Sequence, residues 1–346
     1  MVALGFPTVL LSSIPRTAIG GLQQRLASAQ TEIATQRKAD IGLHLGAATA
    51  RFVDLNWQLA ELDGQKLRIS AARNRAEATQ STLESIRSLT GDFLETLAGA
   101  RGAALGQDIA RQAASGSIAS LYNLLNAEFG GVKLFGGLNS QTNPMPDYEG
   151  GSGQQAVRDA FAANFGFAPS DPSAASITPD RMLDFVNGAF ARLFDEANWQ
   201  TLWTEAAPKN ATVMLSNGQQ VEASSSATAG FAVSLTQAFS MMLELSQGPL
   251  RQDAFAALVD TALSKMSGAQ QELIAEQSRM GLAQERLTAA EAERDTKSVT
   301  AKKAIEMMQG VDTYALAMKV NTLTTQLEAS YALTGRLSRL SLLAYI

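Results

Sequence analysis

A long apolar stripe in the C-terminal stretch, residues 310–346, constrains this chain more than any other feature. After Gly310 the stretch has no proline and one interior glycine, Gly335. Its apolar residues recur at steps of three and four, at Leu316, Val320, Leu323 and Leu327, and after Ser330 at Leu333, Leu337, Leu340 and Leu343. These steps predict one face of a helix about 50 Å long at ~1.5 Å per residue. Such a face needs a partner helix of similar length.

The best candidate for that partner lies near the other end of the chain, in residues 16–38. Leu22, Leu26, Ala29 and Ile33 follow one another at steps of four, three and four. One interpretation is a helix on a local core. The other is that residues 16–38 and 311–346 pair as the two chain ends, also across subunits. Residues 1–15 contain two prolines and no clean period, so we expect a poorly ordered leader there, without signal-peptide cleavage.

Three more helices are predicted, over residues 52–97, 103–127 and 250–309. The last carries a heptad pattern, which we call the inner seam. Its large positions are Met266, Leu273, Met280 and Leu287, and its small positions are Ala262, Ala269, Ala283 and Ala290. Glu276 interrupts the small series. Alanine at one seam position lets neighbouring helices approach closely, so this helix is predicted to pack inside a bundle.

The middle of the chain, residues 141–249, is predicted to be a mixed α+β insert. Just before the insert, paired glycines flank a short apolar strand at 132–135. Within the insert, the GGSG run at 150–153 marks a linker or hairpin tip. Thr178-Pro179-Asp180 has the composition of a helix start, and Trp199 and Trp203 are expected to cover that helix. Asn217-Gly218, between 212–216 and 219–223, predicts a β-hairpin.

The sequence offers little material for catalysis. It has no cysteine and one histidine, His44, which lacks other candidate ligands nearby. No phosphate loop, dinucleotide fingerprint, zinc-protease motif or nucleophile elbow is present. We therefore predict no catalytic residue, no cofactor and no metal site, and a function carried by surfaces.

The net charge and the length of the apolar runs limit the classes of partner that this chain can bind. The net charge is −5, and no basic run is present, which argues against nucleic acid or an anionic membrane surface as a partner. No apolar run of about 20 residues is present to cross a membrane.

Three segments resemble the flagellin family of bacterial flagellar axial proteins. They are QQRLASAQTEIATQRKAD at 23–40, FGGVKLFGGLNSQTNPMPDY at 129–148 and KVNTLTTQLEASYALTGRLSRLSLLAYI at 319–346. The second and third are most similar to the branch of hook-associated proteins. The resemblance covers about residues 16–140 and 255–346 and leaves the middle, which varies in this family.

The predicted fold is mainly α: a long antiparallel helical bundle or coiled coil formed by N- and C-terminal segments, with an inserted α+β region in the middle. The resemblance implies how this fold divides into domains. Arms at 1–40 and 310–346 would form a terminal coiled-coil domain. Residues 41–140 and 250–309 would form the two halves of an inner helical domain, and residues 141–249 a variable insert. The arms would assemble through Leu22, Leu26, Ile33, Leu316, Val320, Leu323, Leu327, Leu333, Leu337, Leu340 and Leu343.

The function implied is a structural one, at the junction of flagellar hook and filament. The expected partners are other copies of the chain in a helical array, neighbouring axial proteins and an export chaperone. The chain would be exported to the extracellular flagellum without a cleaved signal. Two alternatives stay open: a filament flagellin, and a helical-bundle enzyme or cofactor carrier.

Overall fold

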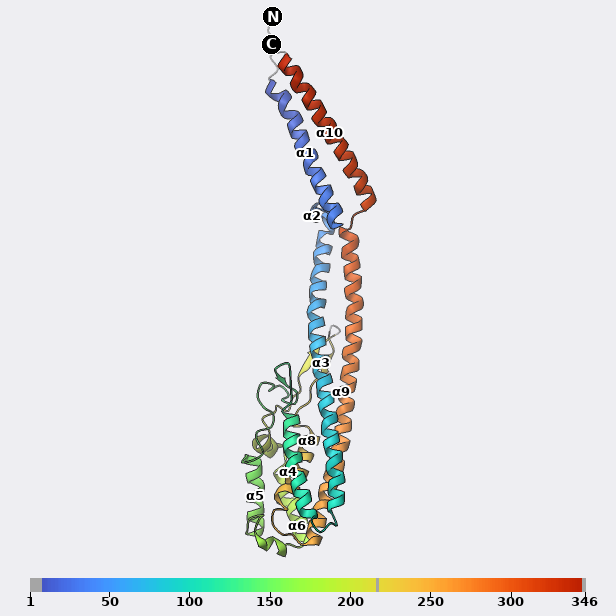
Figure 1. Ribbon diagram of the computed structural model, residues 1–346. Helices are drawn as coiled ribbons and strands as arrows, with labels where there is room; N and C mark the ends of the chain where they lie inside the picture. The colour runs from blue at the N-terminus through green and yellow to red at the C-terminus, as the bar shows by residue number, and fades with distance from the viewer. Residues whose placement is uncertain (1–7, 216–217, 344–346) are drawn as a thin grey trace. The chain divides into compact units, whose positions relative to one another are not determined.

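The structure is a computed structural model that describes the backbone of residues 8–215 and 218–343, with side chains described over 16–215 and 218–336. It is mainly α-helical with two small strand pairs, which confirms the predicted fold class. The chain divides into two compact units, residues 1–63 with 295–346 and residues 64–294. The helices α3 (Thr49–Ala100) and α9 (Gln252–Gln309) contribute to both units (Figure 1). The division of the sequence into five parts stays a prediction.

In the first unit, α1 (Thr8–Thr35) and α10 (Thr313–Leu343) lie side by side (Figure 1). The pair is antiparallel. Gln23 of α1 donates to the Tyr331 hydroxyl of α10 at 2.8 Å, whereas Arg37, just after α1, bridges to Gly310, just before α10. The predicted pairing of the two chain ends is therefore present within one copy. Short helices follow α1, namely α2 (Ile41–Leu45) and a 3₁₀ turn (Gly46–Ala48).

The start of α1 corrects one expectation. Residues 8–15 were expected to be a poorly ordered leader, but α1 begins by Thr8 and continues through Pro15. A proline inside a helix removes one hydrogen bond and clashes with the preceding turn, which is why Pro15 suggested a boundary. The helix tolerates this local loss. Residues 1–7 lie outside the described residues.

In the second unit, α3 and α9 run antiparallel along each other. Arg73 of α3 pairs with Glu291 of α9 at 2.5 Å, and further along α3 Arg101 pairs with Asp260, earlier in α9, at 2.6 Å. Two further helices, α4 (Gly106–Leu125) and α8 (Gly230–Glu244), pack against each other and join the same core. Phe93 of α3 meets Phe239 of α8 edge to face, with ring centroids 4.9 Å apart. Aromatic pairs of this geometry add stability beyond the area that they bury.

The insert is mostly helical. It contains α5 (Ser152–Phe165), a 3₁₀ turn (Pro172–Ser176), α6 (Pro179–Phe185), α7 (Glu196–Asn198) and two π-helical segments (Val186–Phe190 and Trp199–Trp203). The predicted helix start at Thr178-Pro179 is confirmed. The two tryptophans are 2% exposed and stack with centroids 6.0 Å apart, and Trp203 also stacks on Phe194 at 4.7 Å. They cover the insert core as expected.

Two antiparallel hairpins complete the fold. The first pairs β1 (Glu128–Phe129) with β2 (Val132–Lys133), and the second pairs β3 (Thr212–Met214) with β4 (Gln220–Glu222). The second confirms the hairpin predicted from Asn217-Gly218, with Gly218 at a φ of 79°. The predicted strand over 132–135 is too long. Leu134 and Phe135 are both buried, whereas consecutive strand residues point to opposite faces, so the chain leaves the hairpin and enters the core.

The GGSG run is also corrected, because it is neither a linker nor a hairpin tip. Helix α5 begins at Ser152, inside the run. A Cβ added to Gly153 would lie 2.5 Å from the Trp203 ring. This glycine is required because the indole packs directly against the backbone of α5.

Candidate assembly surface

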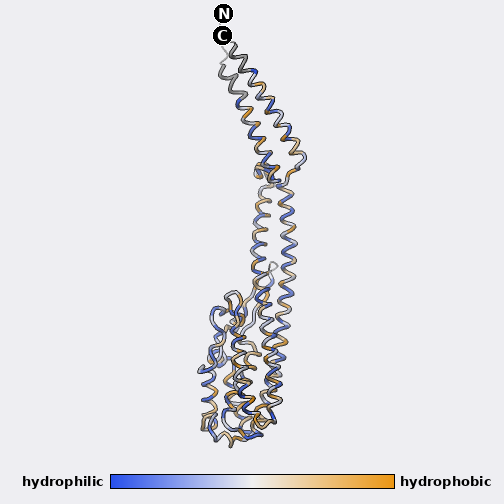
Figure 2. Tube along the Cα trace, in the orientation of Figure 1, coloured by the Kyte–Doolittle hydropathy of each residue, from blue (hydrophilic) through white to orange (hydrophobic). Residues whose placement is uncertain are grey.

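The contact between α1 and α10 is thin. Its buried members are Ala29, Leu316 and Leu323, each between 2% and 6% exposed, and Leu22, Leu26, Val311 and Val320 pack against them half-buried. Hydrophobic and hydrophilic residues interleave along both helices (Figure 2). Two helices alone cannot enclose all the apolar residues that they carry, so part of each predicted stripe stays on the surface.

The predicted assembly residues divide by exposure. Leu316 and Leu323 are buried, and Leu22, Leu26, Val320 and Leu327 are half-buried. Ile33 is 36% exposed and Leu333 is 60% exposed. The side chains of Leu337, Leu340 and Leu343 lie outside the described residues. Their role in assembly stays a prediction.

The exposure of Leu333 shows that the C-terminal stripe is not continuous. From Leu327 to Leu333 is a step of six residues, which at about 100° per residue rotates the side chain by roughly 120° off the first face. The positions that continue toward α1 are held by Ser330 and Thr334, both half-buried. The polar step at Ser330 therefore separates two apolar faces, and Leu333 belongs to the second.

Further apolar side chains on α10 were not predicted from the sequence. Tyr314 is 79% exposed, Met318 is 55% exposed and Tyr331 is 49% exposed. Tyr314 and Met318 lie four residues apart, so they occupy one face, away from the buried Leu316. Their spacing could have been found as a second series beside the leucine stripe.

The inner seam lies in the core of the second unit. Met266, Leu273, Met280 and Leu287 are 0% exposed, and the four alanines of the small series are buried with them. Glu276 is the exception in the structure as in the sequence, since its side chain binds Arg279 and Ser225. Burial would raise the pKa of Glu276, but the hydrogen bonds from Arg279 and Ser225 outweigh it and lower the pKa below its usual value.

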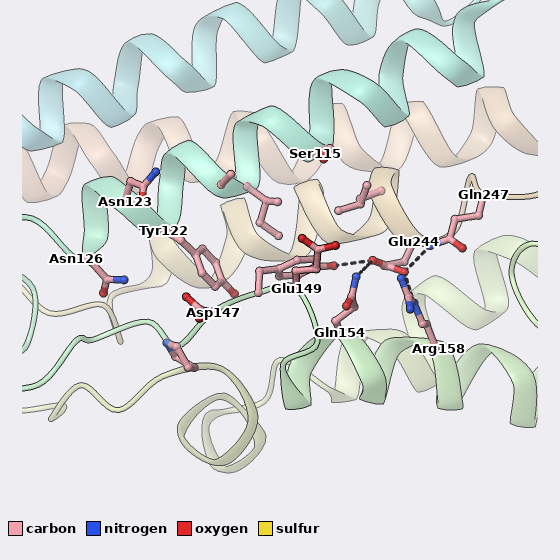
Figure 3. A pocket seen from close by; sticks show the side chains of 15 residues that line it. Ser115, Tyr122, Asn123, Asn126, Asp147, Glu149, Gln154, Arg158, Glu244 and Gln247 are labelled. Carbon is pink, nitrogen blue, oxygen red and sulfur yellow. Dashed lines mark hydrogen bonds and ion pairs between the residues drawn. The ribbon is translucent and has the colours of Figure 1, made fainter.

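A buried carboxylate in the insert was missed altogether. Glu244 of α8 has a fully buried side chain that accepts hydrogen bonds from Gln154 and Arg158 at 2.7 Å, from Gln247 at 2.6 Å and from the Tyr148 hydroxyl at 3.2 Å (Figure 3). Burial and the neighbouring Glu244 carboxylate raise the pKa of Tyr148 far above its usual value. The donors to Glu244 come from α5, the loop before α5 and the turn after α8, so no local sequence pattern could have predicted the cluster.

A cavity of about 750 Å³ borders this cluster, lined among others by Tyr122, Tyr148 and Glu244 (Figure 3). Both oxygens of Glu244 already accept two hydrogen bonds each. A saturated carboxylate of this kind holds α5 against α8 and leaves no acceptor for chemistry.

Neither metal binding nor membrane crossing finds support in the described part of the chain. No group of three or more His, Asp or Glu side chains there could hold a metal ion. Across 8–215 and 218–343, no helix is both long and apolar enough to span a bilayer.

The fold and this surface define a class: a mainly helical protein whose first and last helices pair and leave apolar side chains exposed. Comparison with protein families matches residues 7–140 to the bacterial flagellin N-terminal helical region and residues 260–346 to the C-terminal helical region. The chain therefore belongs to the bacterial flagellin family, whose members are structural components of the flagellum rather than enzymes.

Two solved structures align with this chain. A protein described as a flagellar hook-associated protein from Vibrio parahaemolyticus aligns with a TM-score of 0.53 at 11% identity, over 75% of this chain and 96% of that chain. FlgL of Bacillus cereus aligns with a TM-score of 0.47 at 12% identity, over 73% of this chain and 100% of that chain. No curated protein sequence matches.

Proposed function

We propose that this chain is a junction subunit that joins the flagellar hook to the filament. The observation that carries the proposal is the fold shared with 96% of the chain from Vibrio parahaemolyticus that is described as a flagellar hook-associated protein. The sequence segments at 129–148 and 319–346, which resemble the hook-associated branch, support the same assignment.

Assembly would use the surfaces that the α1–α10 pair leaves exposed. Tyr314, Met318, Leu333 and Ile33 are apolar side chains in contact with water in one copy. Their burial against neighbouring copies would stabilise an array by about 25 cal/mol per Å² of apolar surface. Contacts between different faces repeat without closing at one level, which suits a helical axial structure.

The proposal also covers the proteins that the subunit would contact and the way it would be exported. The subunit would contact hook-side and filament-side axial proteins, would be exported to the cell exterior without a cleaved signal, and would be held by a chaperone before export. It would carry no catalytic activity. Metal or cofactor bound at one per purified chain would contradict this last point.

A filament flagellin is the second candidate, since both matched regions are flagellin regions. Copy number separates the two, because a junction needs few subunits and a filament needs thousands. Deletion of the gene followed by electron microscopy tests the choice. Bare hooks with flagellin shed into the medium would support the junction role, whereas hooks with no shed flagellin would indicate the filament subunit.

A further inference from the structure

The part of α3 that belongs to the first unit carries a tryptophan in contact with water. Trp57 is 73% exposed, and Val53, four residues before it, is 47% exposed. Ala60, three residues after Trp57, is exposed as well. Steps of four and three place these side chains on one face of the helix, which is about 10 Å long. We call this surface the tryptophan face.

The tryptophan face points away from the helix that packs against α3. Trp57 lies two residues from both Leu55 and Leu59, which are half-buried, so its side chain is rotated by about 200° from theirs. Leu59 and Ile305 of α9 line one cavity, and α3 and α9 lie side by side (Figure 1). The tryptophan face is therefore on the side of α3 that α9 leaves uncovered.

A second face of similar length lies on α9, in the same unit. Val299 and Met307 are 64% and 72% exposed, and the exposed Lys303 lies midway between them. Two steps of four keep the three residues on one side of the helix, over about 12 Å. Lys303 lies two residues from both Ala301 and Ile305, which are buried, so this lysine face also points away from the helix pair. The two faces thus lie on opposite sides of the pair.

The size of the exposed indole points to a protein partner. Single apolar side chains on a surface are common, but Trp57 has Val53 and Ala60 beside it on the same face. Tryptophan is enriched at the centres of protein interfaces, where its burial contributes more to binding than that of most residues. Methionine and the aliphatic stem of lysine adapt to the shape of such a ring, so the lysine face offers a suitable surface.

The charges beside the two faces are complementary. Asp54 and Glu61, seven residues apart, lie on one flank of the tryptophan face, and both are exposed. Lys303 forms no ion pair with any described residue of its own copy. Lys302 and Glu306 flank the lysine face with opposite charges, so Lys303 gives this face its net positive charge. The faces therefore match in length, in apolar character and in the sign of their charges.

We propose that the tryptophan face of one copy packs on the lysine face of a second copy. The inference rests on the proposed function, because it requires copies to assemble, and it adds a contact outside the α1–α10 pair. Trp57 would pack between Val299 and Met307, and Lys303 would pair with Asp54. Because the two faces differ and lie on opposite sides, each copy can bind one neighbour through each face. A contact of this head-to-tail kind repeats along an array.

Exchanging the two charges tests the contact directly. Asp54→Lys, Lys303→Asp and the double variant are each expressed as full-length chain in a strain that lacks the gene. Immunoblots give the ratio of chain in isolated flagella to chain in the medium. Each single variant places like charges across the contact and should lower this ratio about tenfold. The double variant restores the attraction and should return the ratio to within about twofold of the parent.

The apolar part of the contact is tested by Trp57→Ala, which should lower the same ratio at least about tenfold. Leu43→Ala is the matched control, because Leu43 is 84% exposed and lies outside both faces, and it should keep the parental ratio. Thermal melts of the purified variants check that each folds like the parent, as expected for substitutions at exposed positions.

Three results would contradict the inference. Parental incorporation of Trp57→Ala would overturn it and leave the junction role standing. Loss in both single charge variants without recovery in the double variant would also overturn it, and would assign the two faces to different neighbouring proteins. Absence of the parent chain from flagella would instead overturn the junction role, and the inference with it.

Discussion

Arg279 of α9 donates from Nη1 to a carboxylate oxygen of Glu222 in β4 at 2.9 Å. Its Nη2 donates to the Ser224 carbonyl at 2.8 Å and to Glu276, one turn earlier on α9, at 2.5 Å. One guanidinium therefore holds the β3–β4 hairpin against the inner helix. The same geometry explains why Glu276 occupies a seam position where the heptad otherwise places alanine.

Replacing Arg279 should loosen the hairpin. Arg279→Ala removes the bonds to Glu222, Ser224 and Glu276 and leaves a largely buried carboxylate without its cation, which should cost about 1–3 kcal/mol. Urea denaturation measures the loss, and hydrogen exchange should show faster exchange of the β4 amides. Arg286→Ala, on an exposed position of the same helix, is the control and should change stability by less than about 0.5 kcal/mol. Equal effects from the two variants would contradict the docking role.

The Glu276 cluster also predicts a pH dependence. The pKa of Glu276 is lowered in the folded state, so the unfolded chain binds its proton first as pH falls. Its contribution to stability is complete above the unfolded pKa, near 4.3, and is lost as pH falls through the lower folded pKa. Urea midpoints at pH 7, 5, 4 and 3 should show Glu276→Gln losing less stability toward acid than the parent. Parallel curves for the two proteins would argue against this linkage.

The helical part of the fold could be predicted because periodicity reports burial directly. The seam from Met266 to Leu287 is buried as its heptad spacing predicts, and the end helices pair as their stripes suggest. Helix boundaries were harder to predict. Pro15 lies inside α1 although proline favours a helix boundary, and at the GGSG run tertiary packing overrode the local signal. At Gly153 the deciding atom belongs to Trp203, 50 positions later, which no local pattern reveals.

The candidate site was less accessible to sequence reasoning. When apolar residues are only counted along the sequence, the C-terminal stripe looks continuous from Leu327 to Leu333. The step of six residues between them nevertheless rotates the apolar face by about a third of a turn. Glu244 is a polar residue whose hydrogen-bond partners come from other segments of the chain. Its burial depends on tertiary contacts, so periodicity carries no signal for it.

Adjacent residues on α9 give a sharp test of the inner seam. Leu273 is 0% exposed and Ile274 is 53% exposed. Leu273→Asp places an unpaired charge in the core and should cost at least about 4 kcal/mol, enough to unfold a marginal domain. Ile274→Asp, the matched control, should cost under about 1 kcal/mol, mainly through helix propensity. Thermal melts followed by circular dichroism compare the two, and an unchanged melt for Leu273→Asp would rule out the seam.

Two glycines in helices should respond to alanine with opposite signs. Gly153→Ala would put a methyl group against the Trp203 ring and should destabilise the second unit by about 1–3 kcal/mol. Gly281→Ala meets no atom within 4 Å and should stabilise α9 by about 0.5–1 kcal/mol. Urea denaturation of both variants measures the difference. A neutral Gly153→Ala would mean that the indole can move away from α5 at no cost.

Leu323 and Leu333, on the same helix, separate pairing within a copy from assembly between copies. Leu323 is 6% exposed against α1, so Leu323→Asp should free α1 from α10 and speed hydrogen exchange in both helices. Leu333 is 60% exposed, so Leu333→Asp should leave that exchange unchanged and still lower incorporation into flagella, because the charge would enter an interface between copies. Thr325→Asp, at an exposed polar position of α10, controls for the added charge. Normal incorporation of Leu333→Asp would remove this second face from the assembly surface, whereas unchanged exchange in Leu323→Asp would mean that the α1–α10 contact does not form in solution.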